Sequence, residues 1–412
     1  MINYVYVAKQ PILDKKLNIF AYEILYRDAS KKENIENSRY TSAAVISSIL
    51  NKFGTKQLLG NRRAFVSIDE KFLLSDIVFS VPKEFFVLSV KAETLGKEQM
   101  LKRVGELYKK GYMLSVETAA VNETFFEIYG AALRFFAYCK VLDNVDKNAI
   151  EKLHENSMEV IAVHIEDEES YLRMKNFGCD AFEGYFFAQP KIVTSEEHNP
   201  SRMAVLQLYN KLMEDNSIDE VADEFEKNPE ITVQLLQFVN SASFHFRTKI
   251  ASIQQVIVLL GRLELAQWLM LMIYAKSVSS NTEMSPLMIM VKNRAELMQR
   301  VLKEVSPKIE KERVAEAYMV GVLSLMDTLF SMPLIEILDN LNVSAEVKDA
   351  LLYDKGTLGD IYKFVRSLES MDGEGISDFE LRYKVASQKI RTIVLDSLEV
   401  VAKLENPSEN EV

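Results

Sequence analysis

The stretch QPILDKKLNIFAYEILYRD, residues 10–28, decides how the rest of this chain can be interpreted. Residues 19–27 follow a turn and are rich in aromatic and branched side chains, which predicts a β-strand. Successive strand residues face opposite ways, so Glu23 and Arg27 share one face. In a sheet that is covered on both faces, these charges point into an interior where unpaired charge is costly. The pair therefore indicates a site, or the remains of one.

Strand patterns alternate with helical patterns from this stretch to about residue 187. The expected strands are 19–27, 64–68, 85–91, 113–118, 135–142, 159–165 and 181–187, and the expected helices are 42–53, 97–109, 122–129, 147–156 and 168–176. Regular alternation requires a parallel sheet, and this number of units predicts an α/β fold of the TIM-type (β/α) barrel kind. A doubly wound open sheet is the alternative, although no GxGxxG turn follows a strand.

The second half of the chain has almost no strand signal. The polar segment QPKIVTSEEHNP, 189–200, contains two prolines and is typical of a linker. Helix starts are indicated by Ser217 with Glu220, by Pro229 and Pro286, and by Ser377 with Glu380. Apolar residues at helical spacing predict a last helix over 379–404. We therefore expect a barrel at 1–190, a linker at 191–200, an all-helical domain at 201–405 and a disordered tail at 406–412.

Composition restricts the classes of function. Of the 412 residues, 48% are apolar and the net charge is −11, which is typical of a globular protein and argues against an extended nucleic-acid surface. Cys139 and Cys179 lack a CxxC spacing, so buried free thiols are expected. The chain opens with a strand pattern in place of a signal sequence, and its densest apolar run, 265–275, is too short to span a bilayer. We expect a cytoplasmic protein without membrane contact.

Glu23, Ile24, Leu25, Tyr26 and Arg27 resemble the E-A-L-x-R strand that follows a QPI turn in EAL-type cyclic di-GMP phosphodiesterase domains. Further segments follow in that family's order: VSIDEKFL (66–73), VLSVKAE (87–93), YMLSVET (112–118), CKVL (139–142), VIAVHIEDEE (160–169) and FEGYFFAQP (182–190). The helical half resembles the HDOD domain, a relative of HD-type phosphohydrolases, over 228–261, most sharply at Asn240 and Ser241. Together they resemble the EAL-HDOD signalling proteins.

The first resemblance implies a barrel that holds two Mg²⁺ or Mn²⁺ ions through carboxylates at its strand ends. Matching residues remain at Glu23, Glu117, Lys140 and Glu166. The other positions of the family's set hold Ser67, Ser89, Thr118, Leu142, Val163 and Glu183. Serine and threonine are poor metal ligands and valine cannot bind metal, so we expect no catalytic residue, metal or cofactor here. In the helical half, Ser324 and Leu325 stand where HD enzymes have their His-Asp pair.

The retained residues also have structural interpretations. Glu23 and Lys140 are expected to form a buried ion pair, while Glu117 and Glu166 are compatible with solvated positions at the barrel mouth. The resemblance places nucleotide contacts at Gln10, Leu25, Arg27, Gly184 and Tyr185. A fold-anchoring hydrogen bond is the alternative role for Gln10 and Arg27, and helix termination is the alternative for Asn240 and Ser241.

Three functions remain open. The favoured one is a non-enzymatic signalling regulator whose HDOD domain binds a protein partner or a second copy of the chain. The second is a cyclic di-GMP receptor without hydrolysis, although acids at Glu23, Glu117 and Glu166 repel a dianionic ligand, so weak or absent binding is expected. The third is an active phosphodiesterase with an atypical metal set. Because fold alone is a weak guide to function, the site residues decide among them.

Overall fold

The computed structural model describes residues 5–28, 59, 62–188, 200–214, 216–240, 250, 252–275, 285–330 and 332–405. The chain forms two compact units. One, called here the barrel unit, consists of Met1–Gln189, Val278–Pro286 and Phe364–Val412, and the other, the helical unit, consists of Pro190–Ser277 and Leu287–Lys363. The helix expected at 42–53, nearly all of the linker and the tail at 406–412 lie outside the described residues.

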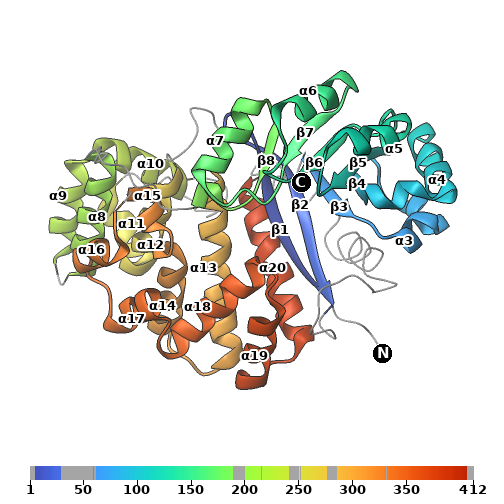
Figure 1. The fold of residues 1–412 in the computed structure, drawn as a ribbon. Coiled ribbons are helices and arrows are strands. Elements are labelled where there is room, and N and C mark those ends of the chain that lie inside the picture. The colour runs from blue at the N-terminus through green and yellow to red at the C-terminus, as the bar shows by residue number, and fades with distance from the viewer. Residues whose placement is uncertain are drawn as a thin grey trace. The chain divides into compact units, whose positions relative to one another are not determined.

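Eight strands close into a barrel in the order of the sequence (Figure 1). They are β1 (Val5–Asp14), β2 (Ile19–Asp28), β3 (Arg63–Ser67), β4 (Phe86–Lys91), β5 (Met113–Thr118), β6 (Tyr138–Val141), β7 (Glu159–Ala162) and β8 (Ala181–Glu183). All neighbours pair in parallel except β1, which is antiparallel to both β2 and β8. The expected α/β barrel is confirmed, with a first strand that runs in the opposite direction to the others.

The reversed first strand follows from the short connection between β1 and β2. The Asp14 carboxylate accepts hydrogen bonds from the backbone N–H groups of Lys16 and Asn18, and Leu17 adopts a left-handed backbone with φ 64°. A connection this short joins antiparallel neighbours, because a parallel pair needs a long crossover. β2 pairs with β3 only over Ala21 to Glu23, so the rest of the β1–β2 hairpin extends past the barrel.

Helices connect the parallel strands, and polar side chains fix where most of them begin. The α-helices are α3 (Glu70–Leu74), α4 (Glu98–Lys109), α5 (Glu123–Leu133), α6 (Lys147–Glu155) and α7 (Glu168–Phe177). Asp69, Asn122, Asp146 and Asp167 each cap one of them by accepting a hydrogen bond from a backbone N–H in its first turn. Short 3₁₀ helices, η1 (Asp76–Ser80), η2 (Ala92–Gly96) and η3 (Phe186–Ala188), were not expected from the sequence.

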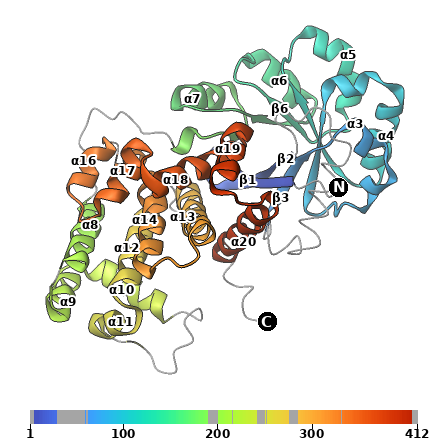
Figure 2. The same ribbon diagram turned by 90° about the horizontal axis from the view of Figure 1, so that it is seen from below.

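The barrel unit also contains the end of the chain. Helices α19 (Gly373–Tyr383) and α20 (Ser387–Glu405) belong to it, and α20 lies along β1 (Figures 1 and 2). The single helix predicted over 379–404 is wrong, because the chain turns at Lys384 with φ 54°. The helix start predicted at Ser377 is also wrong. The Asp372 carboxylate caps α19 instead, accepting from the N–H groups of Glu374 and Gly375.

The helical unit is built from α8 (Pro200–Met213), α9 (Ile218–Glu226), α10 (Pro229–Val239), α11 (Ile253–Leu260), α12 (Arg262–Ala275), most of α13 (Pro286–Val305), α14 (Lys311–Leu323), α15 (Met326–Phe330), α16 (Leu334–Asp339), α17 (Ala345–Tyr353) and the start of α18 (Gly356–Glu369). The apolar run at 265–275 forms α12, whose Leu265 and Leu269 are fully buried, as expected for a core helix. A Cβ at Gly321 would lie 2.5 Å from the Ala295 backbone, so α14 and α13 approach closely there.

The division into two units differs from the domain limits expected from the sequence, because residues 364–405 group with the barrel and not with the helical unit.

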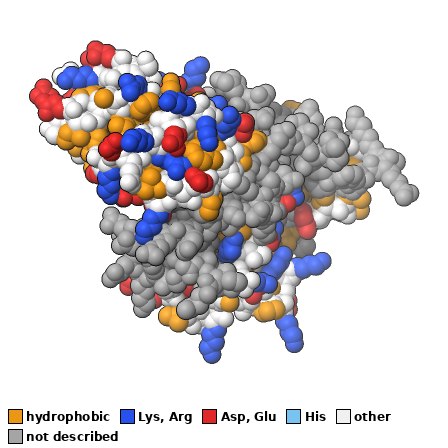
Figure 3. All heavy atoms as spheres, turned by 90° about the vertical axis from the view of Figure 1, so that its right-hand side faces the viewer, with side chains coloured by type: hydrophobic (Ala, Val, Ile, Leu, Met, Phe, Trp, Pro, Cys, Tyr) orange, Lys and Arg blue, Asp and Glu red, His pale blue; other side chains and the backbone are white. Residues whose placement is uncertain are grey.

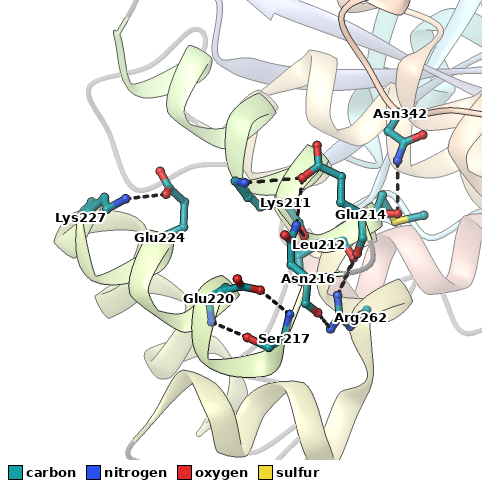
Figure 4. A network of polar contacts seen from close by, with 11 residues as sticks. Lys211, Leu212, Glu214, Asn216, Ser217, Glu220, Glu224, Lys227, Arg262 and Asn342 are labelled. Atoms are coloured by element: carbon teal, nitrogen blue, oxygen red, sulfur yellow. Dashed lines mark hydrogen bonds and ion pairs between the residues drawn. The ribbon is translucent and has the colours of Figure 1, made fainter.

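A polar network joins the end of α8 to the starts of α9 and α12 (Figure 4). Ser217 and Glu220 form the predicted capping box at the start of α9. The Arg262 guanidinium donates to the carbonyl oxygens of Leu212, Glu214 and Asn216, which follow or end α8. Arg262 thus satisfies carbonyl groups that a helix end leaves without partners.

The described surface that includes α3 and α4 carries Lys and Arg side chains interspersed with Asp and Glu (Figure 3). Exposed ion pairs such as Lys102–Glu98 at 2.8 Å and Lys97–Glu70 at 2.6 Å contribute to this mixture. Within the part of the chain that the structure describes, no single helix has the length and apolar content to cross a membrane. The bent pair Ile253–Leu260 and Arg262–Tyr274 passes that test jointly, with a bend of 112°.

Candidate functional site

Four charged side chains meet inside the barrel near the carboxyl ends of its strands. Lys140 on β6 forms an ion pair with Glu23 on β2, and its Nζ also lies 3.6 Å from carboxylate oxygens of both Glu117 on β5 and Glu183 on β8. Glu23, Lys140 and Glu183 are only 3%, 5% and 6% exposed. The predicted buried Glu23–Lys140 pair is therefore present, within a larger cluster of one ammonium and three carboxylates.

The charges in this cluster shift the pKa values of its members. Burial raises the pKa of the Glu23 carboxyl to about 8, and Glu183 and Glu117 add to the rise while Lys140 opposes it. Burial alone would lower the pKa of Lys140, but attraction to the three carboxylates outweighs it and raises that pKa. Lys140 therefore stays charged, and Glu23 holds a proton more tightly than an exposed carboxyl does.

A row of serines lies beside the charged cluster. Ser67, Ser89 and Ser115 are consecutive partners in the register of β3, β4 and β5. The Ser67 hydroxyl donates a hydrogen bond of 2.6 Å to Glu117, whereas the buried hydroxyls of Ser89 and Ser115 have no hydrogen-bond partner among the described residues. Ser67 and Ser89 are the two for which the sequence resemblance implies metal positions, and neither supplies a carboxylate.

A cavity of about 420 Å³ opens above the cluster. Its lining includes all four charged residues, the apolar side chains of Leu25, Leu142 and Val163, and residues at or just after the strand ends: Lys91, Glu93, Thr118, Ala119 and His164. This volume is within the range of small-molecule sites in proteins. Four of the lining residues are glutamates and two are lysines, so the cavity carries an excess of acidic groups.

The other residues predicted from the sequence differ in whether they line the cavity. Leu25 lines it, but Gln10 and Glu166 do not, and Glu166 is exposed before α7. The Arg27 side chain lies outside the described part of the structure. Gly184 is required by the backbone, because it has φ +147° and a Cβ there would lie 2.0 Å from the Ile165 carbonyl oxygen.

Tyr185, where the family resemblance places a nucleotide contact, makes a contact within its own chain. Its hydroxyl donates a hydrogen bond of 3.0 Å to the carbonyl oxygen of Glu369, at the end of α18. Glu369 belongs to the chain segment that groups with the barrel. Tyr185 thus links the loop after β8 to the C-terminal helices.

The carboxylates of the cluster are engaged by other groups of the protein. In the described part of the chain, no group of three or more His, Cys, Asp or Glu side chains is arranged to hold a metal ion. The Lys140 ammonium lies among the carboxylates that would have to bind such ions, and Glu117 already accepts from Ser67. A cation that is covalently part of the protein thus occupies the centre of the acidic cluster.

The HDOD positions in the helical unit also have structural partners. The Asn240 side chain holds both sides of the segment between α10 and α11, since it donates to the carbonyl oxygens of Leu236 and Ile250 and accepts from the Ile250 N–H. Ser241 lies outside the described residues. Ser324, at the place of the HD histidine, accepts from the buried Arg294 guanidinium at 3.0 Å and donates to the Gly321 carbonyl oxygen.

Sequence reasoning missed several residues of the cavity. Glu183 was noted only as a replacement, yet it is the third carboxylate around Lys140. Lys91 and His164 were not singled out, although both come directly at or after a strand end, where barrel sites are built. His164 has a left-handed backbone with φ 58°, a conformation that the local sequence does not signal.

Comparison with known proteins adds an independent finding. Residues 200–336 match the HDOD domain family. The chain is 26% identical over 409 residues to the uncharacterized protein YuxH of Bacillus subtilis, with 96% of this chain and 97% of YuxH covered. It is 24% identical over 400 residues to the cyclic di-GMP phosphodiesterase CdgJ of Vibrio cholerae, with 95% and 91% covered.

Among solved structures, the barrel is similar to the FimX EAL domain of Pseudomonas aeruginosa bound to c-di-GMP. The identity is 15%, the TM-score is 0.35, and the match covers 45% of this chain and 89% of that domain. The chain thus combines an eight-stranded α/β barrel with a helical region whose residues 200–336 match the HDOD domain family.

Proposed function

We propose that this EAL-HDOD protein is a regulator in cyclic di-GMP signalling that does not hydrolyse the dinucleotide and acts by binding protein through its HDOD domain. The observation that carries this proposal is that Ser67 and Ser89, neighbours on β3 and β4 beside the charged cluster, supply hydroxyl groups where the family resemblance implies metal ligands. Hydrolysis by two metal ions needs oxygen ligands of higher charge than a hydroxyl at such positions. The buried, unpaired thiols of Cys139 and Cys179 support a reducing, cytoplasmic setting.

The competing function is phosphodiesterase activity. It is favoured by the relative CdgJ, whose name gives that activity and whose sequence aligns over nearly the whole chain. Against it stand Ser67, Ser89, Thr118 and Val163 at the positions of metal ligands. Relatives at this identity can share an architecture and differ in the chemistry of their sites.

Incubation of the full chain with cyclic di-GMP and Mg²⁺ or Mn²⁺ tests the two functions directly. We expect no linear dinucleotide at high protein concentration, measured by chromatography. The matched control is Glu23→Gln, which removes one cluster carboxylate with little change of shape. Product that forms with the unaltered chain and disappears in Glu23→Gln would falsify the non-catalytic proposal.

A cyclic di-GMP receptor without hydrolysis is the second alternative. We expect weak or absent binding, because the cavity has four glutamates against two lysines and Tyr185 is bonded to Glu369. Calorimetric titration with the dinucleotide, with and without divalent cations, measures this. Sub-micromolar affinity that is lost in Arg27→Ala would establish the receptor function instead.

The protein-binding part of the proposal concerns apolar side chains exposed on the helical unit. Val233 on α10 is 52% exposed, and Val258 and Leu259 on the neighbouring α11 are 70% and 49% exposed. Single exposed apolar residues are common, so this part of the proposal rests on Val258 and Leu259, which are consecutive on α11 and both exposed. The partner is unidentified, and a second copy of the chain is the first candidate to test.

Light scattering after size exclusion, over a range of concentrations, tests self-association of the full chain. We expect association that Val258→Glu abolishes. Leu381→Glu is the matched control, since Leu381 is 74% exposed on α19 of the barrel unit. A strictly monomeric chain that also captures no protein from a cell lysate would contradict this part of the proposal.

A further inference from the structure

Apolar side chains are exposed at the amino-terminal end of the barrel strands, opposite the end that holds the cavity. Ile77 in η1 is 59% exposed, and Tyr108 in the last turn of α4 is 51% exposed. The end of η1, of α4 and of α5 each leads into the start of a parallel strand, β4, β5 and β6 respectively, so these segments gather at one end of the barrel. The cavity and its charged cluster leave this surface unexplained.

Ring and cation contacts join the three segments into one surface, called here the basic patch. The Lys110 ammonium lies 3.5 Å from the centroid of the Phe79 ring in η1, and Lys83 donates a hydrogen bond of 3.0 Å to the Lys110 carbonyl oxygen. The Tyr108 ring lies 5.5 Å, between centroids, from the ring of Phe135 after α5. The basic patch consists of Ile77, Phe79, Lys83, Tyr108, Lys109, Lys110, Arg134 and Phe135.

The patch has an excess of positive charge. The neighbouring Arg103 does not contribute to it, because Asp76 and Glu106 pair with that guanidinium at 3.1 and 3.4 Å. Glu84 adjoins Lys83 in the sequence and offsets one charge. Four cations of the patch are exposed and form no ion pair with a carboxylate among the described residues: Lys83, Lys109, Lys110 and Arg134.

The helical unit contains a surface of the opposite charge. Asp219, Asp223 and Glu226 are exposed on α9 at positions i, i+4 and i+7, which places them along one face of the helix. None of the three forms a hydrogen bond or an ion pair with another described residue. Helix α11 packs on α9 and exposes Val258 and Leu259. These five residues define the α9–α11 surface, in which carboxylates accompany apolar side chains.

We propose that the basic patch of one copy of the chain binds the α9–α11 surface of a second copy. This inference rests on the protein-binding part of the proposed function, and it names the surface that the helical unit contacts on its partner. Because the two surfaces differ, the contact is heterologous.

Charge favours a second copy over other anionic partners. The whole chain carries a net charge of −11, so another copy presents acidic surface to the patch. A narrow helix can contact the four cations alone, whereas an extended membrane surface also meets the exposed carboxylates of Asp76, Glu84 and Glu106 beside the patch. A nucleic-acid backbone offers no apolar surface to Ile77.

Light scattering after size exclusion of the full chain tests the proposal with charge-reversed variants. Lys109→Glu/Lys110→Glu reverses part of the basic patch, and Asp219→Lys/Asp223→Lys reverses part of the α9–α11 surface. We expect each double variant alone to associate at least about tenfold more weakly, because like charges then face each other. An equimolar mixture of the two variants should regain association, since the reversed patch of one meets the reversed α9 of the other.

Lys147→Glu/Lys403→Glu is the matched control. It changes the net charge by the same amount as Lys109→Glu/Lys110→Glu, at exposed positions of α6 and α20 outside the patch. All of the substituted residues are exposed, so the variants should fold as the unaltered chain does.

Three results would overturn the proposal: association that neither double variant weakens, a mixture that does not regain association, or equal weakening by the control. A chain that is monomeric at every concentration overturns it as well, and sedimentation with phosphatidylserine vesicles that Lys109→Glu/Lys110→Glu abolishes would then assign the patch to a lipid surface. The proposed function is tested separately. Association that Val258→Glu abolishes and the patch variants leave unchanged overturns only this inference, whereas linear dinucleotide in the hydrolysis assay overturns the proposed function.

Discussion

At the scale of single residues, the balance of charge around Lys140 sets the stability of the barrel interior. One ammonium group faces Glu23, Glu117 and Glu183, of which Glu23 and Glu183 are buried. Removing one carboxylate leaves the ammonium with two others. Removing the ammonium leaves carboxylates with no opposing charge inside the cluster, which is the more costly change.

We therefore predict that Lys140→Met lowers the free energy of unfolding by about 3–5 kcal/mol, the cost of leaving buried charge uncompensated, and that Glu23→Gln costs clearly less. Urea unfolding followed by far-UV circular dichroism measures both. Lys102→Met is the control, since Lys102 forms an exposed pair with Glu98 that contributes little. Equal losses for Lys140→Met and Glu23→Gln would contradict the asymmetry.

Asp180 gives a second prediction, with a defined dependence on pH. Burial alone raises the pKa of this carboxyl, but hydrogen bonds from the Val160 N–H, Lys15 and His154 outweigh it and lower the pKa. Because the folded pKa lies below that of the unfolded chain, the resulting stability is present above the unfolded pKa of about 4 and is lost as pH falls through the folded value.

Asp180→Asn should accordingly destabilise the chain by about 1–3 kcal/mol at pH 7, the range for hydrogen bonds to charged groups, and by less as the pH is lowered through the folded pKa. Thermal unfolding of both proteins, at a series of pH values from 7 down to the folded pKa of Asp180, provides the measurement. The same loss at every pH would show that the charge of Asp180 is not the cause.

The sequence predicts part of the site and misses the rest for physical reasons. Glu23 and Lys140 were recognisable because a charge on a strand that is covered on both faces needs a partner. The role of Glu183 depends on which strands become neighbours when β1 closes the barrel, and the role of Tyr185 depends on Glu369, which follows 184 residues later. Neither of these contacts can be predicted from the residues that adjoin Glu183 or Tyr185 in the sequence.

At the scale of elements, starts of helices were easier to predict than interruptions. The capping box of Ser217 and Glu220 was correct, because that pair satisfies its N–H groups within one turn. The break between α19 and α20 was missed, since apolar spacing continues across Lys384 and no glycine or proline marks the turn. The same limit applies to the 3₁₀ helices: η2 falls between the strand predicted at 85–91 and the helix predicted at 97–109, and η3 overlaps the end of the strand predicted at 181–187.

Arg262 provides the element-scale prediction. It belongs to α12 but satisfies carbonyl oxygens at the end of α8, so Arg262→Ala should loosen that corner of the helical unit by about 1–3 kcal/mol. Trp268, the single tryptophan of the chain, is buried in α12, so its fluorescence in urea reports on this unit. Lys227→Ala is the control from the same region, since Lys227 pairs with Glu224 at an exposed site (Figure 4). A midpoint that Arg262→Ala does not move would argue against the capping role.

At the scale of the whole molecule, the two units are not successive in the sequence. The helical unit is inserted between the barrel strands and the segment Phe364–Val412 that completes the barrel unit. This segment was expected to be part of the helical domain, because a helical pattern alone does not indicate which core a helix joins. Stacking of Phe364 on Phe379, with ring centroids 4.0 Å apart, is one of the contacts within it.

Removal of the chain after Lys384 should therefore affect the barrel unit rather than the helical unit. Loss of α20 uncovers β1, and we expect a lower unfolding midpoint by circular dichroism with little change in the Trp268 fluorescence transition. The comparison needs the full-length chain measured in parallel. A matching shift of the Trp268 transition would mean that α20 stabilises both units.

The position of α20 on β1 also has a consequence for synthesis on the ribosome. β1 leaves the exit tunnel before the helical unit and α20 leaves it afterwards, so the two can meet only after all residues of the helical unit have been translated. Nascent chains thus carry a β1 strand that α20 does not cover while the helical unit is translated. An uncovered apolar strand is a target for chaperones, and slow translation of the middle of the gene would prolong that exposure.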